Sequence, residues 1–90
     1  MYAITAIISG RVQGVWFRGS TQKKAMELGL TGWVKNTTDG SVYLEAQGEK
    51  SQLEIFISWL SKGPNYSRVD QVDIKWIEAT TQYISFSIRY

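Results

Sequence analysis

The chain has 90 residues, 43% of them hydrophobic, which suffices for one compact domain over residues 1–90 and excludes a disordered chain. It contains neither Cys nor His, which excludes disulfides, thiolate nucleophiles and an imidazole base, and a cytoplasmic location is expected. A net charge of +2 is too small to indicate nucleic acid, and no apolar stretch is long enough for a membrane span or resembles a signal peptide.

The first half of the chain predicts a strand, a helix and a hairpin. Residues 2–9 are rich in β-branched side chains and alternate in character, which predicts a strand that ends at the following glycine. After a loop, residues 19–28 predict a helix, although the glycine at its start is a poor helix former. Residues 33–36 and 42–47 predict two strands, and the Asp-Gly pair within residues 37–40 is typical of the turn between them.

The second half predicts a helix followed by two strands. Ser51 and Glu54 have the spacing of a capping box, and Gly63-Pro64 would end the helix that they begin. Residues 72–76 and 84–88 alternate between apolar and polar side chains and predict the last two strands. The apolar face of the helix is expected at Leu53, Phe56, Ile57 and Leu60.

This order, βαββαβ followed by a short C-terminal strand, is typical of an α+β protein with the ferredoxin-like split βαβ arrangement. In that arrangement, two helices cover one face of a largely antiparallel sheet. Trp33, Phe56 and Trp76 are candidates for the core because of their strand or helix spacing. Because this fold hosts many functions, the function has to be inferred from the loops.

The loop between the first strand and the first helix has the composition of an anion site. It reads Gly10-Arg-Val-Gln-Gly-Val-Trp-Phe-Arg18, and its glycines allow the backbone to approach an anion closely. A strand–loop–helix junction also directs N–H groups to one place near the positive end of the helix dipole. Arg18 adds a permanently charged fork that fits phosphate oxygens. A plain surface loop has the same spacing, but the apolar run within residues 12–17 favours a rigid cradle.

The loop matches Gly-x-Val-Gln-Gly-Val-x-Phe-Arg at every fixed position, and the chain thereby resembles the acylphosphatase family. A second motif of that family also fits, from Gly29-Leu-Thr-Gly-Trp-Val-Lys-Asn36 through Gly40-Ser-Val42 to Gly48. The similarity extends over nearly the whole chain and includes Gly63-Pro64. The fold of the family is the ferredoxin-like fold expected above.

The resemblance implies an enzyme that hydrolyses the mixed anhydride of a carboxylic acid and phosphate, without metal or cofactor. In it, Arg18 and the loop amides would bind the phosphate of a small acyl phosphate, or a phosphate or sulfate ion in the same place. Asn36 would orient the attacking water, and Thr37 would hold Asn36. Because the leaving group is already a carboxylate, positioning and charge stabilisation suffice for catalysis. The loop residues concerned are Val12, Gln13, Gly14, Val15, Trp16, Phe17 and Arg18.

Several of these residues have a structural alternative. Asn36 precedes a hairpin, where Asn is common because its side chain can hydrogen bond to the backbone of the turn. Thr37 fits a turn equally well. Gln13 is expected to shape the loop and not to react. Trp16 either lines the acyl side of the pocket or only covers the loop. The physiological substrate stays open among carbamoyl, acetyl and bisphosphoglycerate-type phosphates.

Two other functions are compatible with the predicted fold. A βαββαβ domain can bind RNA by stacking bases on its sheet, but the third strand, Val42-Tyr-Leu-Glu-Ala-Gln-Gly48, lacks the basic aromatic run of an RNA recognition motif. Acylphosphatase-like domains also occur within larger proteins, where phosphate binding without turnover would serve as a ligand sensor. A free-standing chain favours the enzyme, and we expect a monomer without a nucleic-acid or membrane partner.

Overall fold

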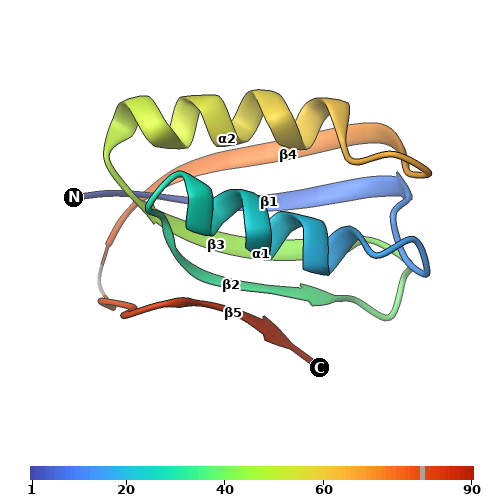
Figure 1. The fold of residues 1–90 in the computed structure, drawn as a ribbon, viewed down its shortest axis with the longest axis horizontal. Helices are drawn as coiled ribbons and strands as arrows, with labels where there is room; N and C mark the ends of the chain where they lie inside the picture. The colour runs from blue at the N-terminus through green and yellow to red at the C-terminus, as the bar shows by residue number, and fades with distance from the viewer. Residues whose placement is uncertain (80) are drawn as a thin grey trace.

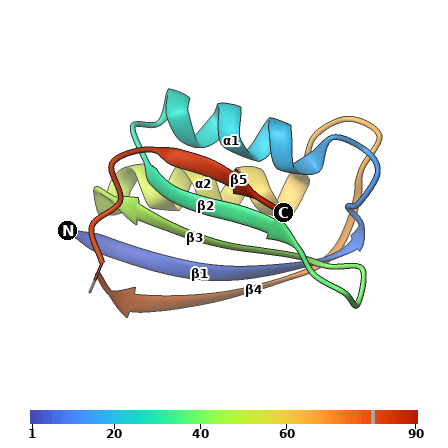
Figure 2. The same cartoon turned by 90° about the horizontal axis from the view of Figure 1, so that it is seen from below.

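The computed structural model describes residues 1–79 and 81–90, which form a five-stranded sheet with two helices on one of its faces (Figure 1). The strands lie in the order β4-β1-β3-β2-β5, and all neighbours are antiparallel except β2 and β5. Figure 2 shows the strands side by side from the face that the helices leave open. The elements are β1 (Tyr2–Arg11), α1 (Phe17–Glu27), β2 (Thr31–Asn36), β3 (Val42–Gly48), α2 (Lys50–Lys62), β4 (Arg68–Glu78) and β5 (Phe86–Arg89). The predicted ferredoxin-like α+β fold is therefore confirmed.

The core lies between the two helices and the sheet face that they cover. The β1–β3 register places Ile4 opposite Ala46 and Ile8 opposite Val42, and all four side chains are buried. Complete burial of an aliphatic side chain of this size contributes about 1.5–3 kcal/mol. The helix α2 adds Leu53, Phe56 and Leu60, which are all fully buried at positions predicted from the sequence. This packing fixes the ends of β1 and β2, from which the functional loops begin.

The boundaries of the first two elements differ from those predicted. The strand β1 continues to Arg11, and its register against β4 shifts between Ser9 and Gly10, so Gly10 belongs to the strand and not to the loop. The helix α1 begins at Phe17, two residues before the predicted start. Its first turn therefore includes Arg18, and the loop between β1 and α1 is shorter than the motif suggests.

Later boundaries differ as well. The predicted capping box is wrong, because α2 begins at Lys50 and Ser51 falls inside its first turn, with no side-chain cap at Glu49. The strand β3 continues to Gly48 in its ladder with β1, and the chain turns directly into the helix there. The ladder between β1 and β4 likewise extends β4 well beyond residues 72–76. Neither of the two helices in the described part of the chain has the length and apolar character that a bilayer span requires.

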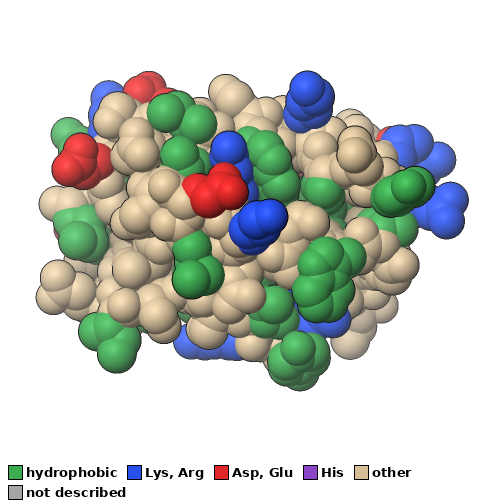
Figure 3. Space-filling view, in the orientation of Figure 1, with side chains coloured by type: hydrophobic (Ala, Val, Ile, Leu, Met, Phe, Trp, Pro, Cys, Tyr) green, Lys and Arg blue, Asp and Glu red, His purple; other side chains and the backbone are tan. Residues whose placement is uncertain are grey.

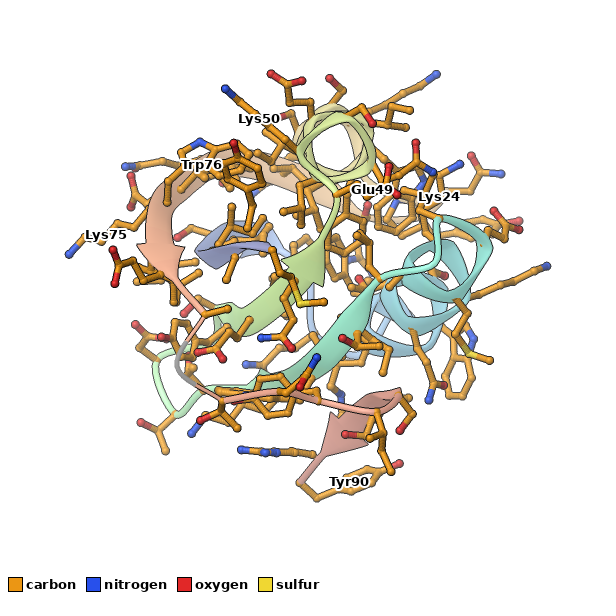
Figure 4. All side chains as sticks on the ribbon, turned by 90° about the vertical axis from the view of Figure 1, so that its left-hand side faces the viewer. Lys24, Glu49, Lys50, Lys75, Trp76 and Tyr90 are labelled. Carbon is orange, nitrogen blue, oxygen red and sulfur yellow. The ribbon has the colours of Figure 1, made fainter. Side chains whose placement is uncertain are left out.

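The three aromatic core candidates have different environments. Phe56 is fully buried beneath α2, as predicted. Trp33 is also buried, but it lies on the other face of the sheet, where its indole N–H donates to the Tyr83 hydroxyl at 3.1 Å. The prediction for Trp76 is wrong, because 45% of this side chain is exposed. It belongs to the edge strand β4 beside the beginning of α2 (Figure 4), and its ring meets the ring of Tyr2 edge-on.

Candidate active site

Two strand ends bring the predicted site residues together. Because β1 and β2 both run antiparallel to β3, they run parallel to each other, and their last residues lie at the same end of the sheet. Arg18 lies in the first turn of α1, just after the loop that leaves β1, and Asn36 is the last residue of β2. Both line a cavity of about 580 Å³. Arg18 and Asn36 are 18 positions apart in the sequence, yet both line the same cavity.

The cavity combines predicted residues with residues from three further segments. The predicted loop residues line it except for Gln13, and Thr37 is also absent from its lining in the described structure. The remaining lining comes from Gly19, from the loop between α2 and β4, and from the last strand and the residue after it. Those additional residues are Gly19, Tyr66, Ile88 and Tyr90.

The backbone of the loop is shaped to bind an anion. Gly14 has φ 75° and Trp16 has φ 62°, so two left-handed residues lie two positions apart, with one residue between them. Such turns direct successive N–H groups to one concave side. Within residues 1–79 and 81–90, no hydrogen bond to another protein group is donated by the N–H groups of residues 13–16. These donors are therefore free to bind a ligand at the beginning of α1.

Arg18 is positioned by the chain around β5. Its Nη1 donates to the Arg89 carbonyl at 3.3 Å, and its Cζ lies 4.8 Å from the centre of the Tyr90 ring. Figure 4 shows Tyr90 beyond the end of β5. Neither of the two ion pairs in the described part of the chain involves Arg18. The guanidinium is therefore held in place without a carboxylate partner, and its charge is available to an anion.

The side-chain oxygen of Asn36 lacks a hydrogen-bond donor among the described residues. Its Oδ1 is buried, and no group of the described residues donates a hydrogen bond to it. Leaving such an atom unpaired costs about 1–3 kcal/mol. Because Asn36 also lines the cavity, a rotation of its side-chain amide can bring a hydrogen-bonding group to a water or substrate atom there.

Gln13 connects the loop to the hairpin that follows Asn36. Its Nε2 donates to the carbonyl of Thr37 and to the carbonyl of Ser41, both at 2.8 Å. The side chain is partly buried and points to the hairpin, away from the cavity lining. This geometry fixes the distance between the loop amides and the end of β2.

The Thr37 hydroxyl is bound within the turn. It contacts the Asp39 carboxylate and lies 3.1 Å from the Ser41 carbonyl and 2.7 Å from the Ser41 hydroxyl. Hydrogen bonds from the hydroxyls of Ser41 and Thr37 lower the pKa of Asp39 from 3.8 to about 2. Within the described structure, Thr37 has no hydrogen bond to the Asn36 amide, so any effect on Asn36 passes through the backbone of the turn.

Gly19 has a structural explanation that the sequence did not reveal. A Cβ at this position would collide with the indole of Trp16, which folds back over the first turn of α1. Only glycine leaves room for the ring, and this requirement outweighs its poor helix propensity. Tyr66, Ile88 and Tyr90 lie far from the two motifs in sequence, and no local pattern marks them as site residues.

The donor set of the cavity suits an anion. Its lining has amide N–H groups, one guanidinium and one side-chain amide, and none of its side chains is a carboxylate, thiol or imidazole. Across residues 1–79 and 81–90, no three His, Cys, Asp or Glu side chains gather in a way that could hold a metal ion.

Comparisons with known proteins give a consistent result. The family model Acylphosphatase matches residues 4–88. An acylphosphatase from Methylococcus capsulatus is 40% identical over 88 residues, which cover 98% of this chain and 96% of the relative. The crystal structure of acylphosphatase from Bacillus subtilis has a TM-score of 0.97 at 36% identity, with both chains covered completely. A phosphate- and nucleotide-bound HypF has a TM-score of 0.85 at 29% identity, with 12% of its chain covered.

Proposed function

This chain belongs to the acylphosphatase family, and on that premise we propose that it hydrolyses small acyl phosphates to a carboxylate and inorganic phosphate. The observation that carries the proposal is the shared cavity of Arg18 and Asn36 beside free backbone donors. This arrangement offers a place for the phosphate and, next to it, a side-chain amide for a water molecule.

The phosphate binds to the loop and to Arg18. The N–H groups of residues 12–18 surround its oxygens near the positive end of α1, and the guanidinium donates to the same oxygens. The negative charge on these oxygens changes during the reaction, and donors fixed in advance stabilise it without rearrangement. Arg18 suits this role because its charge has no carboxylate partner in the described part of the chain.

Asn36 orients the attacking water. Its side-chain amide forms a hydrogen bond with the water, which turns a lone pair of the water oxygen toward phosphorus. The new P–O bond forms as the bond from phosphorus to the acyl oxygen breaks, and the electron pair leaves with the carboxylate. A phosphate oxygen takes the proton of the water. The carboxylate leaving group needs no acid, so the reaction requires no His or metal.

Gln13 and Thr37 support this arrangement without reacting. Gln13 binds the Thr37 carbonyl and so ties the loop to the residue after Asn36. The Thr37 hydroxyl stabilises the turn through Asp39 and Ser41. Together they keep the water-binding amide at a fixed distance from the phosphate site.

We also propose that the enzyme works as a metal-independent monomer in the cytoplasm. Arg18 and Asn36 meet in a cavity formed within one chain, and its lining side chains include no Cys, His, Asp or Glu. A chain without Cys has no disulfide to lose in a reducing compartment.

Initial rates with a panel of acyl phosphates test the proposal. We expect hydrolysis of acetyl, carbamoyl and benzoyl phosphate, unchanged by a chelator and inhibited competitively by phosphate and sulfate. Phosphate binding without turnover of any member would favour a ligand sensor instead. Failure of both binding and turnover would contradict the assignment of the cavity.

A further inference from the structure

A second cavity lies between α1 and the last turn of α2, and its volume is about 440 Å³. Three of the six lysines of the chain line it, and Glu27 is the one carboxylate among the described residues that do so. We call this cavity the lysine groove after Lys23, Lys24 and Lys62. Figure 3 looks onto the helices and shows basic side chains on this face, with an acidic one among them. Positive charge therefore predominates in the lining.

The ammonium groups of the lysine groove are largely without counter-charge. Of the three, Lys24 alone has an ion-pair partner in the described part of the chain, with its Nζ 3.7 Å from a Glu27 carboxylate oxygen. Ser20 and Asn65 add a hydroxyl and an amide to the lining, and both groups can donate to an anion. The groove thus offers several donors for an anion and one opposing charge.

The helix dipoles explain only part of this arrangement. Lys24 and Lys62 lie in the last turns of their helices, where a cation is favourable. Lys23 precedes the last turn of α1 and has no such role. The dipoles also act at each helix end separately, and they do not require that all three lysines line one cavity. A multiply charged anion in the groove accounts for both observations.

Trp59 contributes an aromatic ring to the lysine groove and connects it to the active-site cavity. Its ring stacks on that of Phe56, with 6.3 Å between the centres and 5° between the planes, so the packing of α2 fixes its position. The centre of the same ring lies 6.2 Å from that of Phe17, which lines the active-site cavity. Gly19 and Tyr66 line that cavity as well, and the residues next to them in the chain line the groove. A ligand in the groove is therefore close to the proposed phosphate site.

Three ammonium groups around one space suit an anion whose charges are spread over several atoms. A chain of two or three phosphates presents an oxygen to each ammonium, and lysine imposes no fixed geometry on such contacts because its charge is compact and its stem flexible. We propose that the lysine groove binds the di- or triphosphate group of a small molecule, and that this anion weakens phosphate binding in the adjacent cavity by charge repulsion. The binding site goes beyond the proposed function, whereas its effect on turnover rests on that function.

Calorimetric titration with inorganic triphosphate tests the binding site directly. Orthophosphate is present throughout at about ten times its dissociation constant, so that the active-site cavity is filled. Wild-type protein is expected to bind one triphosphate per chain under these conditions. The variant Lys23→Gln/Lys24→Gln/Lys62→Gln should bind it at least about tenfold more weakly, because it lacks the charges that face the ligand.

A matched control separates the lysine groove from the net charge of the protein. The variant Lys35→Gln/Lys50→Gln/Lys75→Gln loses the same charge, but from the three lysines outside the groove. It should change the dissociation constant of triphosphate less than about threefold, since charges that are distant from the ligand are screened. Equal weakening in both variants, or no triphosphate bound to wild-type protein, would overturn the inference.

Titrations with ATP and AMP identify the source of the phosphate chain. Equal affinity for triphosphate and ATP would assign the groove to the phosphate chain alone, and tighter binding of ATP would assign it to a nucleotide whose base contacts Trp59. Both results support the site. AMP carries a single phosphate and should bind at least about tenfold more weakly than ATP. Equal binding of AMP and ATP would contradict recognition of a phosphate chain.

The effect on the active-site cavity is measured as inhibition of acetyl phosphate hydrolysis. Triphosphate should raise KM about twofold to fivefold more in wild-type protein than in the variant without the groove lysines, with kcat nearly unchanged, because the bound anion repels the substrate phosphate. An equal rise of KM in the two proteins would show that triphosphate acts only within the cavity and would contradict the coupling. If acetyl phosphate is not hydrolysed, the proposed function fails, and the titrations still decide whether the groove binds a phosphate chain.

Discussion

The Gln13 side-chain amide donates to the Thr37 carbonyl at 2.8 Å and links the loop after β1 to the residue that follows Asn36. The two residues are 24 positions apart, and one belongs to each of the two sequence motifs. The same amide also reaches the Ser41 carbonyl across the turn. The loop amides proposed to bind phosphate and the Asn36 proposed to orient water are therefore linked by hydrogen bonds, which suits catalysis by positioning.

Replacement of Gln13 tests this link. Gln13→Ala should lower kcat about tenfold to a hundredfold, because a small displacement of the reacting groups is costly, and should reduce stability by about 1–2 kcal/mol. Steady-state kinetics and urea unfolding measure the two effects. Gln22→Ala is a matched control, since Gln22 Nε2 donates to the Phe86 carbonyl at 3.0 Å and does not line the cavity. An equal loss of activity in both variants would argue against a specific role for Gln13.

Asn36 should show opposite effects on activity and stability. Asn36→Ala removes a buried acceptor that has no partner among the described residues, so unfolding experiments should reveal little loss of stability or a small gain. Activity should fall about 10²-fold to 10³-fold, because the attacking water loses its orienting group. A strongly destabilised variant would show instead that the amide is structural.

The low pKa of Asp39 predicts a pH dependence of stability. The hydroxyls of Ser41 and Thr37 stabilise the carboxylate and lower its pKa in the folded state to about 2, below the ordinary value of 3.8. The folded state therefore binds this proton less readily than the unfolded state. The stabilisation is complete above about pH 3.8 and is lost as the pH falls toward about 2. Urea midpoints between pH 6 and 2 should converge for wild-type protein and Asp39→Asn at the acidic end, and a constant difference would contradict this expectation.

The contact between Trp16 and Gly19 should appear as a coupling between substitutions. Gly19→Ala should destabilise wild-type protein, because the added Cβ collides with the indole. In a Trp16→Ala background the same change should stabilise the protein by about 0.5–1 kcal/mol, the ordinary gain of alanine over glycine in a helix. Thermal or urea unfolding of the four proteins gives the cycle. Additive effects would indicate that the ring does not require the space at Gly19.

The sequence predicted those features that depend on neighbouring residues. The apolar positions of α2 and the alternation in β1 were sufficient for the fold, since each element buries a face that its own periodicity defines. The contiguous motif around Arg18 likewise indicated an anion site. The capping box at Ser51 was wrong, because the strand pairing of β3 determines where α2 begins. Trp76 is exposed because β4 lies at the edge of the sheet, which a single strand cannot reveal.

The remaining part of the site depends on tertiary structure. Tyr66 and Tyr90 reach the cavity only because α2 and β5 return to the end of the sheet where β1 and β2 end. No spacing in the sequence encodes this meeting. The need for glycine at position 19 cannot be predicted from the sequence either, because it depends on where the Trp16 ring lies in the folded chain.

The rate of acyl phosphate hydrolysis by wild-type protein and Arg18→Ala, measured with a chelator present, tests the central claim most directly. We predict turnover by wild-type protein, and loss of both turnover and phosphate inhibition in a folded Arg18→Ala variant. Undiminished hydrolysis by Arg18→Ala, or wild-type protein that turns over only when a metal ion is added, would contradict the proposed roles of the loop and Arg18.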